Sequence, residues 1–134
     1  MKKALRILAL SIVLVTLVAA FASCGAPAKD PDDALAALKE NEYTAAKDEV
    51  FVPLALKAQN VDGVKTVISG TKITEEKTEH VTVIYFDDKD AANEAWEAVE
   101  KYAENSKKDE SDWVVKKSGA MIYFGTSAGI KAAK

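Results

Sequence analysis

The sequence predicts an α+β fold: a mainly antiparallel sheet of four to five strands with one long and two to three short helices. Three observations support this prediction. Residues 64–73 and 80–86 are rich in β-branched side chains and flank a short charged segment, which is typical of an antiparallel hairpin. Residues 89–106 place apolar side chains at helical spacing. Helices and strands do not alternate one by one, as they would around a parallel sheet.

The first half of the domain contains two predicted helices and a short strand. Asp30 followed by Pro31 is a strong helix start, because Asp caps free N–H groups and Pro suits the first turn. This helix ends near Asn41, and a short strand over 43–46 follows it. A short helix running to about Gln59 comes next, with Pro53 in its first turn, because proline disrupts a strand but suits a first helical turn.

The second half contains two predicted hairpins, each preceded by helical sequence. Acidic residues before the long helix favour the positive end of its dipole, and Thr126 or Ser127 caps the last helix. A tight turn at Ser118-Gly119 joins the last two strands. The predicted elements are, in order, the strands 64–73 and 80–86, the helix 89–106, the strands 113–117 and 120–125, and a short helix ending at Lys134. This order gives helix–strand–strand units.

The N-terminus has the three parts of a secretory signal peptide. Lys2, Lys3 and Arg6 precede an apolar run over 7–21, and small residues follow it. The run is shorter than the roughly 20 apolar residues that a membrane-spanning helix requires. We therefore expect a signal peptide over 1–23, a tether over 24–29 and a single α+β domain over 30–134.

Residues 20–25 read AFASCG and resemble the lipobox of bacterial lipoproteins. The resemblance implies that Cys24 carries a lipid on its sulfur, such as a palmitate-bearing diacylglyceryl group, and becomes the mature N-terminus. Phe21 departs from the pattern, which usually has an aliphatic residue there. Two other interpretations stay open: an ordinary thiol after a conventional cleavage site, or an uncleaved anchor.

Residues 112–126 read DWVVKKSGAMIYFGT, and with the signal they resemble small uncharacterised lipoproteins of Gram-positive gut bacteria. This resemblance implies no known activity. It implies a location at the cell envelope, on the extracytoplasmic side of the cell membrane, through the lipid on Cys24. We expect a monomer whose partner, a protein or a small molecule, the sequence does not identify.

Composition excludes several classes of function. Without residues 1–23 the chain has no arginine and 15 lysines against 21 acids, so we expect no nucleic-acid partner. One cysteine excludes an internal disulfide framework and an all-cysteine zinc site. No phosphate-binding glycine motif occurs. We therefore expect no cofactor and no metal.

Catalytic constellations are also missing from the sequence. His80 is the only histidine, and acids precede it at 75, 76 and 79. No serine stands in a Gly-x-Ser-x-Gly elbow, and the acids at 87–90 lack the glycine and glutamate that a calcium loop needs. We expect a non-catalytic binding or envelope-associated domain. The alternative is an extracellular enzyme that uses His80 and nearby carboxylates.

Two strands carry apolar residues on both faces. Tyr85, Met121 and Tyr123 are candidates for a shared binding face, with Lys65 and Lys117 at its rim. Two arrangements account for such strands: helices cover both faces, or one aromatic-rich face is partly open. Burial of both faces is the simpler arrangement. The candidate for an open binding face is the one that carries Tyr85, Met121 and Tyr123, because only the helix over 89–106 is long enough to cover much of a sheet.

Overall fold

The computed structural model describes residues 25–107 and 112–134. The predicted signal segment and the predicted lipidation site at Cys24 lie outside the described residues. Within the described part of the chain, no helix is long and apolar enough to cross a membrane.

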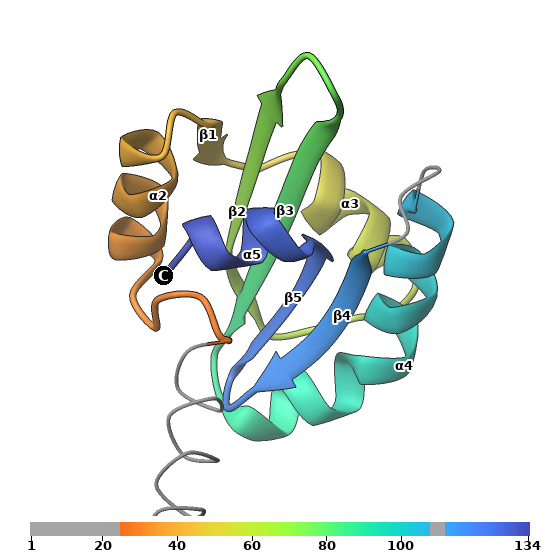
Figure 1. Ribbon diagram of the computed structural model, residues 1–134. Helices are drawn as coiled ribbons and strands as arrows, with labels where there is room; N and C mark the ends of the chain where they lie inside the picture. Colours follow the sequence, from red (N-terminus) through yellow and green to blue (C-terminus); the bar gives the residue numbers. More distant parts are fainter. Residues whose placement is uncertain (1–24, 108–111) are drawn as a thin grey trace, which may run out of the picture.

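Five strands form one antiparallel sheet in the order β1-β2-β3-β5-β4 (Figure 1). The strands are β1 (Thr44–Lys47), β2 (Val64–Ile73), β3 (Thr78–Phe86), β4 (Trp113–Ser118) and β5 (Met121–Thr126). The helices of the described residues are α2 (Pro31–Glu40), α3 (Phe51–Ala58), α4 (Lys89–Ser106) and α5 (Ser127–Ala132). The predicted α+β fold, with one long helix and three short ones, is confirmed.

Two hairpins make up most of the sheet, and each follows a helix, as predicted. α3 precedes the hairpin β2–β3, and α4 precedes the hairpin β4–β5. The hairpins join through β3 and β5, with Val83 opposite Tyr123 in the middle of the ladder. The short strand β1 pairs with the second half of β2 and forms one edge of the sheet, while β4 forms the other edge.

Helices cover both faces of the sheet and divide the core in two. On one side, which we call the α2/α5 face, Leu38 and Ile130 pack against Val81 and Val83. In Figure 1 this face is turned to the viewer, with α5 in front of the strands. On the other side, the α3/α4 face, buried side chains come from both helices and from the central strands: Val52, Leu56, Val67, Ile84, Val99 and Phe124.

Three helices begin where the sequence predicts, each at a side-chain cap. The Asp30 carboxylate accepts a hydrogen bond from the N–H of Asp32, at 2.8 Å. The Asp88 carboxylate caps α4, and the Thr126 hydroxyl caps α5. Helix α3 begins at Phe51 and has Pro53 in its first turn, as predicted. The Asp48 carboxylate fixes this start, because it accepts hydrogen bonds from the N–H groups of residues 50, 51 and 52.

Candidate binding surface

The structure brings Tyr85, Met121 and Tyr123 together on the α2/α5 face, but it does not leave them open. Their exposed fractions are 6%, 4% and 4%, and they belong to the same buried cluster as Leu38 and Ile130. The prediction of an open face at these residues is therefore wrong. We expected that only a long helix could cover this area. Two short helices from distant parts of the chain cover it together.

Tyr85 has a structural role on this face. Its hydroxyl donates a hydrogen bond of 2.7 Å to the carbonyl oxygen of Ala28, which fixes the tether against the sheet. Burial raises the pKa of Tyr85 well above its ordinary value, and the charges of Asp30 and Asp33 act in the same direction. The phenol is protonated at neutral pH and donates this hydrogen bond.

The two lysines predicted at the rim of this face lie on opposite sides of the sheet. Lys65 lines a pocket of about 430 Å³ together with Tyr85 and Met121. Lys117 is on the α3/α4 face, where its ammonium group contacts the Asn93 side chain and lies 5.8 Å from the centre of the Trp96 ring. The prediction that Lys117 lies at the rim of this face is therefore wrong.

His80 is not grouped with the carboxylate next to it in the chain. Its Nδ1 lies 3.2 Å from the hydroxyl oxygen of Thr71 on the α3/α4 face. The Glu79 side chain points to the other face, because successive side chains alternate along a strand. There it is buried, and its carboxylate lies 2.9 Å from the Lys77 ammonium group. Among the described residues, no three or more His, Cys, Asp or Glu side chains are grouped to hold a metal ion.

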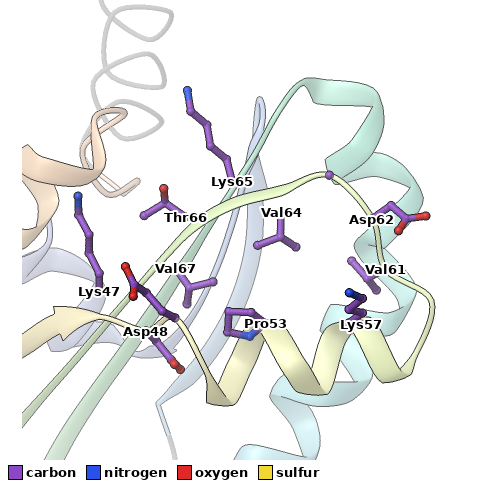
Figure 2. Close-up of a pocket in the computed structure, with 12 residues that line it drawn as sticks. Lys47, Asp48, Pro53, Lys57, Val61, Asp62, Val64, Lys65, Thr66 and Val67 are labelled. Carbon is purple, nitrogen blue, oxygen red and sulfur yellow. The ribbon is translucent and has the colours of Figure 1, made fainter.

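A pocket of about 500 Å³ lies between α3 and the first half of β2, and Figure 2 shows the side chains around it. Lys47 and Lys65 point to the side of β2 away from Pro53 and α3 (Figure 2). Lys47 forms a salt bridge of 3.0 Å with Asp32 of α2, on the opposite face. The Asp48 carboxylate is occupied with the cap of α3. The charged groups around this pocket thus do not converge on a common point.

Part of the sheet on the α3/α4 face, toward the β1 edge, is not covered by any of the described helices. Helices α3 and α4 cover the central strands at Val67, Ile84 and Phe124, which are buried. Further along the same strands, the side chains are small or polar and are exposed or half-buried. We call this surface the open half-face; it consists of Thr44, Ala46, Ser69, Thr71, His80 and Thr82.

Next to the open half-face, the start of α3 exposes three large apolar side chains. Val50 is 60% exposed, Phe51 81% and Leu54 67%, and we call these three residues the apolar corner. A shallow recess of about 510 Å³ connects them to the open half-face, with Val50 and Phe51 on one side and residues of β1 and β2 on the other. This arrangement is typical of a contact surface for another molecule.

The sequence contains a signal for the apolar corner that the prediction missed. In an eight-residue helix, Val52 and Leu56 are four residues apart and occupy the buried side. Phe51 and Leu54 are three residues apart and fall on the other side, so this short helix is apolar all round. Such a helix either lies in a core or exposes an apolar stripe.

The tertiary contacts thus replace the predicted face with a different candidate surface. Its parts are the apolar corner and the open half-face, which β1, β2, β3 and α3 position. We found no protein-family model, no curated protein and no solved structure that matches the chain.

Proposed function

We propose that the chain is an extracytoplasmic lipoprotein, held to the cell membrane by a lipid on Cys24, that binds a protein partner without catalysis. The partner contacts the apolar corner and the adjoining open half-face. The observation that carries this proposal is the 81% exposure of Phe51 beside Leu54 and Val50, on a helix whose other side is buried. Exposed apolar groups of this kind are stabilised when a partner removes them from water.

The apolar corner is held rigidly, which favours binding. Three hydrogen bonds to Asp48 fix the first turn of α3, and buried Val52 and Leu56 fix its other side. A partner therefore meets Phe51 and Leu54 in a fixed position and does not have to order the backbone that carries them.

A protein fits this surface better than a small molecule does. The recess beside Phe51 is shallow, whereas small-molecule sites are concave and enclose most of their ligand. Strand β1 is also the outer strand on this side of the sheet within the described residues. An outer strand offers backbone groups to an extended segment of another protein.

The enzyme alternative gains little support from the arrangement of side chains. An acid–base pair requires His80 and a carboxylate within reach of one substrate atom. The carboxylate of Glu79 is on the other face of the sheet, and it pairs with Lys77. His80 on the open half-face contacts the Thr71 hydroxyl instead.

Photocrosslinking in intact cell envelopes tests the contact surface. A benzophenone amino acid at position 51 should give a crosslink to a discrete protein. The same group at position 101, an exposed site on α4, should give none. Equal products at the two positions, or none at position 51, would contradict the proposed surface.

A variant of the apolar corner separates contact from folding. In Phe51→Ser/Leu54→Ser, a crosslinker at the exposed position 46 should lose its product. The melting temperature should remain close to that of the parent protein, because both side chains are already exposed. The matched control is Glu97→Ser/Lys101→Ser on α4, which should retain the crosslink.

The anchor has a separate test. Cys24→Ser should release the domain into the medium or leave an unprocessed precursor, because the lipid is attached to the cysteine sulfur. Mass spectrometry of the mature protein checks this directly. An unmodified Cys24 at or near the mature N-terminus would exclude the lipid anchor.

A further inference from the structure

The first described residue lies at a recess that is lined by lysines. Gly25, the first described residue, lines a pocket of about 350 Å³ between β4, β5 and α5. Lys116 of β4 and Lys131 and Lys134 at the C-terminal end of the chain also line it, and all three are exposed. We call these three residues the lysine cluster.

The floor of the recess is apolar and fixed. Tyr123 and Ile130 are buried, and Val114 beside them is half-buried. The tether lies against this region through a backbone hydrogen bond of 2.9 Å from the Ala28 N–H to the Ala133 carbonyl oxygen. Figure 1 accordingly shows the C-terminus beside the segment that leads into α2. The lysine cluster and the start of the tether are therefore held together.

The charge of the lysine cluster differs from that of the domain. From residue 24 onward the chain has 15 lysines and 21 acids, yet among the described residues no acidic side chain lines this recess. None of the three lysines forms a salt bridge with another described residue. The cluster is thus a local positive surface on a negatively charged domain.

The position of the cluster identifies what it faces. Gly25 directly follows Cys24 in the chain, so a lipid on Cys24 begins within one peptide unit of the recess. The Debye length is roughly 8 Å at physiological salt, so lysines within that distance of a headgroup are only partly screened from it. At that distance an anionic surface attracts each lysine.

We propose that Lys116, Lys131 and Lys134 form a docking surface for the anionic phospholipid headgroups of the membrane. The inference rests on the proposed anchoring through Cys24. Each lysine near an anionic surface shifts the balance between docked and free orientations about fivefold, so three shift it by about 100-fold. The domain is therefore held in one orientation, with β4 and α5 toward the bilayer.

This orientation places the proposed contact surface away from the membrane. The lysine cluster lies on the α2/α5 face of the sheet, whereas the apolar corner adjoins the open half-face on the α3/α4 side. The two surfaces are therefore on opposite faces of the sheet.

Hydrogen exchange of the lipidated, full mature protein in vesicles tests the docking surface. Mass spectrometry first verifies the lipid on Cys24, so that a failure of anchoring is recognised before docking is measured. We then expect amides of β4 and α5 to exchange more slowly in vesicles of phosphatidylglycerol and phosphatidylcholine than in phosphatidylcholine alone. About 1 M NaCl, which shortens the Debye length to about 3 Å, should remove the difference.

The variants separate docking from nonspecific charge. Lys116→Gln/Lys131→Gln/Lys134→Gln should abolish the protection by anionic vesicles. The matched control is Lys57→Gln/Lys89→Gln/Lys101→Gln, which removes three exposed lysines from α3 and α4. This control should keep the protection by anionic vesicles. Equal exchange in the two kinds of vesicle, or equal loss in the two variants, would overturn the docking surface and leave the contact at the apolar corner unaffected.

Discussion

At the scale of single residues, Tyr85 connects the tether to the sheet. Tyr85→Phe removes one hydrogen bond to the Ala28 carbonyl and keeps the ring in the core. We expect the free energy of unfolding to fall by about 1 kcal/mol, measured by urea denaturation. The tether should also become more susceptible to proteolysis.

Tyr102→Phe is the control, because the hydroxyl of Tyr102 makes no hydrogen bond to another described residue and its ring is only half-buried. It should change the free energy of unfolding by less than about 0.5 kcal/mol. Equal effects of the two substitutions would show that the tether is not held through Tyr85.

Glu79 should make stability depend on acidity. Burial alone would raise the pKa of its carboxyl, but hydrogen bonds from Thr126 and Lys77 and the charges of Lys77 and His80 outweigh burial and lower it. A lowered folded-state pKa stabilises the protein above the ordinary value of 4.5, and this stability is lost as the pH falls through the folded-state value. The free energy of unfolding should therefore fall below about pH 4.5.

The substitution Glu79→Gln tests the source of that acid dependence. It removes the titrating group, so the fall in stability between about pH 4.5 and lower values should become shallower. Glu76→Gln changes an exposed acid in the turn of the same hairpin and should leave the pH profile as it is. Thermal unfolding over a pH series measures the stability of both variants. Parallel plots of stability against pH for Glu79→Gln and the parent protein would contradict the assignment of the acid dependence to Glu79.

At the scale of elements, the start of α3 depends on Asp48. Its carboxylate accepts three backbone N–H groups at 2.9–3.0 Å. Asp48→Ala leaves these groups without their partner and should lower the free energy of unfolding by about 1–2 kcal/mol. Urea denaturation measures the loss, and Asp62→Ala, at an exposed turn position beyond α3, serves as the control. A loss no larger than that of Asp62→Ala would mean that the cap does not hold the helix.

Most element boundaries could be predicted because their signals are local. The bounds of β2 and α4 match the predictions, since a β-branched run and a helical apolar spacing are complete within each segment. The exact start of α3 was less clear from the sequence, because its cap at Asp48 stands three residues before the helix and only Pro53 in the first turn indicated the helix.

At the scale of the whole molecule, Gly125 allows the two hairpins to join. Its φ is 145°, and a Cβ there would lie 2.2 Å from the carbonyl oxygen of His80 on β3. Gly125→Ala should therefore lower the free energy of unfolding by about 3 kcal/mol or more.

Gly119 provides the comparison for this substitution. Its φ is 60°, but no atom of the described residues lies within 4 Å of a Cβ at that position. Gly119→Ala should cost only the backbone strain, about 1 kcal/mol. Thermal or urea unfolding of both variants measures the difference, and equal losses would show that the close approach of β5 to β3 is not limiting.

The layout of the whole molecule also corrects the predicted binding face. Tyr85, Met121 and Tyr123 do share one face, as their spacing predicted, but α2 and α5 meet over it. These helices are nearly 90 residues apart in the chain, yet the side chain of Asn41 donates a hydrogen bond of 3.2 Å to the carbonyl oxygen of Ala132. No local pattern in either segment indicates that contact.

The sequence by itself determined the helices, the strands and the two hairpins, because caps, turns and periodicity act within a few residues. It also determined which residues of each strand share a face, since side chains alternate along a strand. Only the tertiary structure decided which faces are covered, because burial depends on where distant segments pack. That packing buried Tyr85, Met121 and Tyr123, exposed Phe51 and Leu54, and brought Lys116 and Lys131 to the start of the tether.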